Sequence, residues 1–262
     1  MRMHKGQWTK ALPAVLIAVA GLLASPVVLG AQGDEGYKSN QATKSAKKDA
    51  KEAEKISAAE EVLKAAISDE DHGIPRDLLE KAKCIGVFPD FKKVALGIGG
   101  ESGKGLFICR TDGGMSAPAF YKIGGGSVGW QAGVKEADLV LLVMTEEGMN
   151  RLMSDQAEIG TDLSAAAGPA HDADDPDHDK SKEDTKAEDK MREGKDLLAW
   201  SRTHGAFAGA SLDGLGLTAD EDDNQQLYKK PVQARDILTS DKADLPVPQI
   251  AQSFVKTTEQ YM

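Results

Sequence analysis

The chain has little cysteine, few aromatic residues and a shortage of basic charge. Two cysteines among 262 residues are too few for a disulfide-rich scaffold or a four-cysteine zinc module. Lys and Arg number 32 against 42 Asp and Glu, so the formal net charge is −10. General nucleic-acid binding is therefore not expected, because phosphates are neutralised by clustered Lys and Arg. Hydrophobic residues still make up 40% of the chain, which excludes wholesale disorder.

Residues 1–31 have the pattern of a secretory signal peptide. Three basic residues precede an apolar run over residues 11–23, and small residues follow at a plausible cleavage point. An uncleaved membrane anchor is the alternative, although prolines and a glycine within the run disfavour a permanent helix. We therefore expect export to the periplasm, the cell envelope or the extracellular space.

The rest of the sequence predicts one α+β domain over residues 43–262, after a flexible start at 32–42. Residues 43–67 are strong helix formers without Gly or Pro, and a second, short helix is expected after Pro75. Beyond Cys84 the period changes to alternating apolar and small residues. This pattern predicts a glycine-rich, twisted antiparallel sheet or partial barrel, flanked by N- and C-terminal helices.

Within that sheet, residues 94–109 predict a hairpin whose turn is the glycine-rich stretch 100–105. Residues 138–144 predict a fully buried strand, and Thr145 can cap a short helix that ends near Met153. A last helix is expected over residues 250–261.

An acidic segment at 170–196 interrupts the alternating pattern. Residues 172–196 hold 11 acidic and 6 basic residues without an apolar period, which predicts an exposed loop inserted between two strands. His and Asp residues at 171–179 are potential metal ligands. However, the glycine turn and the terminal glutamate of a calcium loop are missing, so no metal site is expected.

Catalytic motifs occur but lack the required context. Residues 125–129 match the G-x-S-x-G pattern around Ser127, yet no helix follows as a nucleophile elbow requires, and a turn is expected instead. The overlapping G-x-G-x-x-G at 124–129 lacks its helix as well. We expect neither an enzyme nor a cofactor, and a serine hydrolase using Ser127 is the least favoured alternative.

Cys84 and Cys109 each lie in a strand-like run. In an exported protein they could form a disulfide if their Cα atoms approach within about 7 Å. Two buried thiols are the alternative, and the sequence leaves both open.

Basic residues at predicted turns stand out in an acidic chain. If they converge, they form an anion-binding patch of the kind that meets anionic lipid surfaces, and a scatter of solubilising charges is the alternative. Lys92 and Lys93 are expected in a turn and Lys104 at a hairpin tip. The candidate lipid-binding residues are Lys104, Arg110, Arg202, Lys92 and Lys93, with Lys44, Lys47, Lys48 and Lys51 of the first helix.

Short blocks in order along residues 55–240 carry a family likeness. They include Ile74-Pro75, Val87-Phe88-Pro89, Gly103-Lys104-Gly105, Gly124–Gly133, Asp138–Met144, Gly160–Ser164 and Gly205–Leu212. Together they resemble the SYLF domain, also called the Ysc84-type actin-binding domain. The acidic segment departs from the family pattern, and so does Lys229, which stands where a glycine is expected.

The resemblance implies lipid binding without a catalytic residue set. Eukaryotic members are associated with phosphoinositides and actin at membranes, and bacterial members are exported. An exported chain does not meet actin, so we expect non-enzymatic binding of anionic phospholipids with phosphoinositide-like headgroups. The alternative is a structural or adhesion protein of the cell envelope with protein partners that the sequence does not name.

Overall fold

The computed structural model describes residues 33–69, 73–154, 156–169, 190, 192–203, 206–241 and 243–262, with side chains described outside 33–42, 95–98, 127–134 and 206. The chain divides into two compact units, residues 1–41 and 42–262. The described part of the first unit is the beginning of helix α1. The predicted signal peptide lies outside the described residues, as does most of the predicted acidic loop.

Helix α1 (Gly33–Ser68) begins ten residues before residue 43, where the sequence analysis placed its start. The C-terminal half of α1 anchors the helix, because its apolar residues recur every three or four positions and are buried. These residues are Ile56, Ala59, Val62, Leu63 and Ala66.

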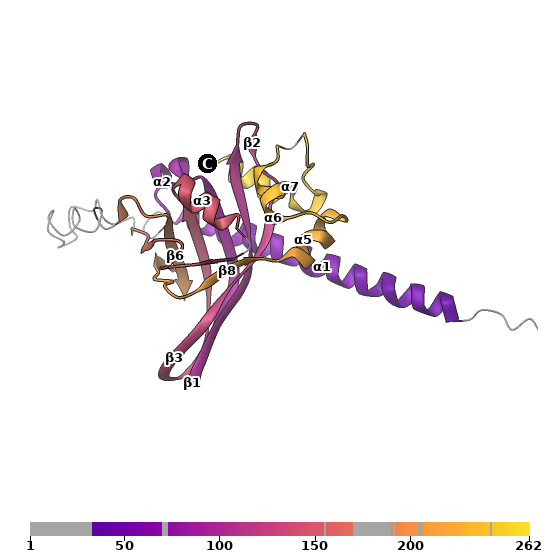
Figure 1. Ribbon diagram of the computed structural model, residues 1–262, viewed down its shortest axis with the longest axis horizontal. Coiled ribbons are helices and arrows are strands. Elements are labelled where there is room, and N and C mark those ends of the chain that lie inside the picture. The colour runs from indigo at the N-terminus through magenta and orange to yellow at the C-terminus, as the bar shows by residue number, and fades with distance from the viewer. Residues whose placement is uncertain are drawn as a thin grey trace, which may run out of the picture. The chain divides into compact units, whose positions relative to one another are not determined.

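In the described part of the chain, eight strands form one curled sheet, which confirms the predicted α+β class (Figure 1). They are β1 (Cys84–Thr111), β2 (Gly114–Met115), β3 (Ala119–Val143), β4 (Gln156–Glu158), β5 (Ala165–Ala167), β6 (Leu197–Thr203), β7 (Ala206–Gly209) and β8 (Gly216–Ala219). The main order is β2-β1-β3-β6-β5, with β7 on β6 and β8 between β3 and β4. The described pairings are antiparallel apart from β5 with β6.

The predicted hairpin at 94–109 is wrong, because β1 is one continuous strand that pairs with β3 along its length. Lys104 is therefore in mid-strand rather than at a tip. Lys92 and Lys93 also lie in the strand, and not in a turn. Strand β1 continues past Pro89. The pairing with β3 is irregular between Phe88 and Phe91, and such an irregularity accommodates a proline within a strand.

Glycines in β1 serve close packing rather than the predicted turn. A Cβ on Gly105 would stand 2.2 Å from the carbonyl oxygen of Val87, and a Cβ on Gly86 would stand 2.4 Å from the ring of Phe107. The two halves of β1 therefore lie against each other, and only residues without a side chain permit this approach.

Short helices complete the unit. Helix α2 (Arg76–Lys81) follows Pro75 as predicted, and α3 (Glu146–Leu152) is capped by Thr145, whose hydroxyl accepts the N–H of Gly148. The predicted C-terminal helix is present as η2 (Gln249–Ala251) and α7 (Gln252–Glu259). Helices α5 (Glu221–Tyr228) and α6 (Ala234–Thr239) were not predicted.

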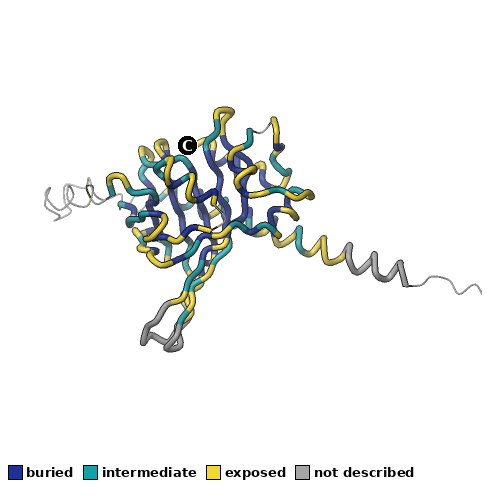
Figure 2. The backbone as a smooth tube through the Cα atoms, viewed as in Figure 1, coloured by how far each residue is buried: buried dark blue, intermediate teal, exposed yellow. Residues whose placement is uncertain are grey.

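Two apolar cores lie on the two faces of the sheet, because alternate residues of β1 point to opposite sides. Helices α1, α2 and α7 cover one face through Ile56, Leu79 and Phe254. The other face curls around Phe107 and Tyr121 and is closed by α3 and α6. Figure 2 shows the buried residues concentrated where the helices cover the sheet.

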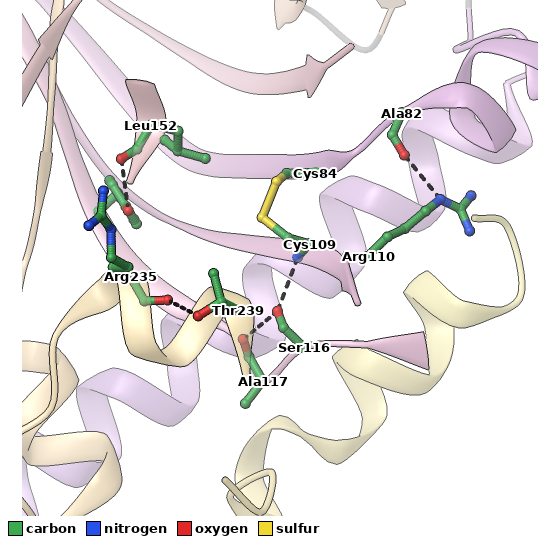
Figure 3. The surroundings of a disulfide bond; sticks show 10 residues. Ala82, Cys84, Cys109, Arg110, Ser116, Ala117, Leu152, Arg235 and Thr239 are labelled. Atoms are coloured by element: carbon green, nitrogen blue, oxygen red, sulfur yellow. Dashed lines mark hydrogen bonds between the residues drawn. A yellow bond between two sulfur atoms is a disulfide. The ribbon is translucent and has the colours of Figure 1, made fainter. Parts of the chain in front are cut away.

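The structure joins Cys84 and Cys109 in a disulfide, which is one of the two alternatives left open by the sequence (Figure 3). Both cysteines are fully buried and lie near the two ends of β1. The disulfide thus connects the two ends of β1, next to the place where β1 pairs with β2. Within the described part of the chain, no helix has the length and apolar character needed to cross a membrane.

Candidate anion-binding site

Two lysines of neighbouring strands share one buried carboxylate. Lys104 of β1 and Lys122 of β3 are directly opposite in the strand register. The ammonium of Lys104 lies 2.6 Å from one oxygen of Asp220, and that of Lys122 lies 2.8 Å from the other. Asp220 stands before the first residue of α5 and is 1% exposed, so its charge is kept from solvent.

The lysines hold this buried carboxylate in its ionised form. Burial by itself raises the pKa of Asp220, but the hydrogen bonds from Lys104 and Lys122 outweigh burial and lower the pKa below its usual value. For Lys104, burial acts to lower the pKa, and the bonds to Asp220 and Asp223 more than reverse that effect. Asp220 and Lys104 are therefore both charged at neutral pH.

Helix α5 supplies a second carboxylate that connects these lysines to α1. Asp223 lies 2.8 Å from the ammonium of Lys104 and 3.4 Å from that of Lys48. The ammonium of Lys48 also donates to the backbone carbonyl of Asp222 at 2.9 Å. The acidic first turn of α5 thus gathers lysines from α1, β1 and β3 at one place.

A hollow of about 710 Å³ opens beside this cluster. We call it the lysine hollow; its charged lining residues are Lys55, Lys92, Lys104, Lys122 and Asp90. Lys104 and Lys122 are 37% and 48% exposed, whereas Asp220 and Asp223 are 1% and 13% exposed. An anion that enters from solvent therefore meets the ammonium groups of Lys104 and Lys122 before the carboxylates of Asp220 and Asp223, whereas Asp90 lines the hollow itself.

The predicted lysines of α1 extend this positive surface. The predicted Lys44, Lys48 and Lys51 are continued by Lys55, which was not predicted. The spacings of four, three and four residues place these lysines on one side of the helix. The last of them lines the lysine hollow. Lys44, Lys47 and Lys51 are exposed.

The other predicted residues lie away from the hollow. Arg110 donates to the backbone carbonyl of Ala82 at 3.0 Å, beside the disulfide (Figure 3). It also donates to the backbone carbonyl of Glu80 at 3.0 Å. Arg202 pairs with Asp138 at 2.6 Å. Neither arginine lines the hollow, so the expected convergence of Lys104, Arg110 and Arg202 does not occur.

Lys92 and Lys93 have separate surroundings. Lys92 lines the hollow and pairs with Glu136 at 2.8 Å. Lys93 points to the other side of β1, since neighbours in a strand alternate, and it pairs with Glu101.

Sequence reasoning missed five groups of this site: Glu52, Lys55, Lys122, Asp220 and Asp223. Lys55 could have been found, because it continues the four-and-three spacing of the α1 lysines. Lys122 and Asp220 carry no local signal, because their roles depend on the pairing of β1 with β3 and on the placement of α5. Glu52 has the character of an ordinary surface residue in sequence, but it is 3% exposed in the structure.

Ser127 does not stand in a nucleophile elbow. It lies within β3 and pairs with Gly99 of β1, so the predicted turn at this position is wrong as well. The elbow requires a sharp passage from a strand into a helix, and β3 continues to Val143. Among the described residues no group of three or more His, Cys, Asp and Glu could hold a metal ion, and residues 171–179 lie outside them.

Comparison with known proteins places the chain in a family. The family model described as Ysc84, Las17-binding protein actin regulator, matches residues 124–261. SH3 domain-containing YSC84-like protein 1 of Homo sapiens is 25% identical over 193 residues, covering 73% of this chain and 52% of that protein. LAS seventeen-binding protein 3 of Saccharomyces cerevisiae is 26% identical over 202 residues, covering 76% of this chain and 42% of that protein.

The chain spans about half the length of the curated relatives it matches. No solved structure matches it. The model match covers more than half of the sequence and includes β3 from Gly124 onward, α5 and the Asp220 carboxylate. The chain therefore belongs to the Ysc84 family.

Proposed function

We propose that this chain binds the headgroups of anionic phospholipids at a membrane surface. The observation that carries the proposal is the lysine hollow, where Lys55, Lys92, Lys104 and Lys122 line one opening in a protein of net charge −10. Three elements supply them, so the positive surface is a product of the fold rather than of one basic run. The proposed role is non-enzymatic.

Electrostatic attraction is the expected driving force. A basic residue close to an anionic bilayer contributes about 1 kcal/mol, and this attraction falls off within a Debye length. Residues 43–55 of α1 have alanine as their apolar residue, so this stretch offers little that could enter the acyl chains. Binding should therefore weaken steeply as salt is added.

Export remains part of the proposal. The basic head and apolar run of residues 1–31 support delivery across a membrane, where the lysine hollow would meet the outer face of a bilayer. Mass spectrometry of the chain recovered from its native cells tests this, because cleavage near residue 31 removes the segment. A full-length chain retained in the cytoplasm contradicts export without affecting the lipid proposal.

Vesicle co-sedimentation tests the lipid proposal. Vesicles of phosphatidylcholine alone are compared with vesicles that also hold phosphatidylinositol phosphate or phosphatidylserine, at roughly 0.05 and 0.5 M salt. The chain should sediment with the anionic vesicles at low salt and remain in solution otherwise. Equal recovery on neutral and anionic vesicles contradicts the proposal.

A charge-matched pair of variants assigns the binding to the hollow. Lys55→Gln with Lys92→Gln removes two positive charges from the hollow. Asp220 keeps both of its ion pairs, because these are made by Lys104 and Lys122. Binding should weaken by about 2 kcal/mol, or roughly 30-fold. The control, Lys64→Gln with Lys81→Gln, removes two exposed charges outside the hollow and should bind as the unaltered chain does.

Binding to a protein partner is the second candidate function. It is favoured by the family description, Las17-binding protein actin regulator, and by the name LAS seventeen-binding protein 3. The chain covers 42% of that relative, so its name does not tell which part binds. Capture of one defined protein by the lipid-free chain, unaffected by the Lys55 and Lys92 substitutions, would favour this candidate over the lipid proposal.

A further inference from the structure

Residues 45–49 of α1 are held against α5 by polar contacts. Asp49 accepts hydrogen bonds from the side chains of Gln226 and Lys229, each at 2.5 Å. Lys48 donates to the carbonyl of Asp222 and pairs with Asp223. Because the apolar anchoring of α1 begins only at Ile56, these contacts determine whether the preceding residues stay on α5.

Glu52 differs from these polar, solvated residues because it is buried. Between residues 43 and 55 it is the one buried residue of α1. Its side chain is 3% exposed, and its Oε1 has no hydrogen-bond partner. A buried carboxylate without donors is costly when ionised and much less costly when protonated.

The charges around Glu52 do not compensate for its burial. On α1, Lys48 attracts the ionised form and Asp49 repels it; Lys55 lies about one turn further along, in the wall of the lysine hollow. From α5 and its C-terminal end, Asp223 repels the ionised form and Lys229 attracts it. Lys104 of β1 is bound to Asp220 and Asp223. Burial, followed by repulsion from Asp223, raises the pKa of Glu52 to about 7.

We propose that Glu52 is a proton-controlled latch: while it is protonated, residues 42–55 of α1 stay on α5, and loss of its proton releases them. Release hydrates the carboxylate and separates it from Asp223. It also frees Lys48 from Asp222 and Asp223, so that its ammonium becomes available to anionic headgroups. This last consequence rests on the function proposed above, whereas the latch does not.

Hydrogen exchange of the lipid-free chain tests the latch. The ordinary pKa of Glu52 applies in the released state, so the equilibrium for release should rise roughly 30-fold between pH 5.5 and 8.5 if the whole change in pKa depends on docking. Amides of residues 42–55 should lose protection to that extent, after correction for intrinsic rates. Amides of α7 should not change.

Two variants make the test specific. Glu52→Gln keeps the shape of the side chain but cannot ionise, so protection of residues 42–55 should be the same at both pH values. Glu54→Gln removes a charge from an exposed site on the same helix and should keep the pH dependence. The latch is overturned if Glu52→Gln retains the pH dependence or if the unaltered chain lacks it. Should Glu52→Gln fail to fold, the comparison of residues 42–55 with α7 in the unaltered chain decides.

The result is independent of membrane binding, because no lipid is present. A working latch with no binding to anionic vesicles would contradict the proposed function alone. Binding to anionic vesicles without pH-dependent exchange would contradict the latch alone.

Discussion

Lys104 and Lys122 face each other across the β1–β3 pairing, and their ammonium groups bind opposite oxygens of one buried carboxylate. Two like charges directly opposite in a sheet are destabilising by themselves. Here Asp220 offsets the repulsion by pairing with both lysines, and it thereby connects the two strands to the beginning of α5. The same arrangement presents both lysines to the lysine hollow.

Removal of the Asp220 charge should therefore destabilise the fold. Asp220→Asn leaves Lys104 and Lys122 opposite each other without their shared counter-charge. We expect a loss of about 2 kcal/mol at pH 7, below the usual range for a fully buried pair because both lysines are partly exposed. Urea unfolding measures this loss.

The pH dependence gives the Asp220 prediction a second readout. Since folding lowers the pKa of Asp220, its contribution is present above the unfolded-state pKa and is lost as pH falls through the lower folded-state pKa. The difference between the unaltered chain and Asp220→Asn should therefore shrink in acid. Asp77→Asn, at an exposed pair with Lys81, is the control and should cost under about 0.5 kcal/mol.

Glu52 should have the opposite effect on stability. Its pKa is raised by folding, so the protonated form is favoured in the folded chain and stability falls as pH rises from the ordinary value of 4.5 towards 7. Glu52→Gln should match the unaltered chain near pH 4 and exceed its stability at pH 8, by at most about 3 kcal/mol. Thermal unfolding at several pH values measures this, and equal stability at pH 8 would contradict it.

Gly105 should tolerate no side chain. In Gly105→Ala the new Cβ would stand 2.2 Å from the carbonyl of Val87 and 2.6 Å from the ring of Phe88, and backbone cannot move aside as a flexible side chain can. We expect a loss of about 3 kcal/mol or failure to fold. Gly126→Ala is the matched control, because nothing lies within 4 Å of its Cβ, and its unfolding midpoint should barely change.

Replacement of Lys229 by glycine should raise the stability of the fold. Lys229 ends α5 with φ of 55°, in the left-handed region that costs a residue with a side chain about 1 kcal/mol. Lys229→Gly removes that cost but also loses the exposed pair with Asp49, which contributes less. It should therefore unfold at higher urea concentration than Lys230→Gly. Lys230 lies outside the positive-φ residues, so glycine there only loosens the chain; the reverse order would contradict the prediction.

Local patterns allowed the helices to be predicted better than the strands. The buried residues of α1 from Ile56 onward and the cap at Thr145 follow from spacing over three or four residues, which helix geometry imposes within one segment. Strand lengths were not predictable in this way. The glycines near Lys104 are typical of a turn, and their use for contact between the two halves of β1 depends on residues such as Val87 that are distant in sequence.

The sequence by itself determined the α+β class, the family likeness and the presence of lysines in an acidic chain, because composition and short-range periodicity carry that information. The tertiary structure alone decided which of those lysines meet. It placed Lys55, Lys92 and Lys122 around Lys104, turned Arg110 and Arg202 to other partners, and buried Glu52 beside α5. The physical reason is that strand register and helix docking are set by the whole core, so charge neighbours far apart in the chain are unknown until the core is assembled.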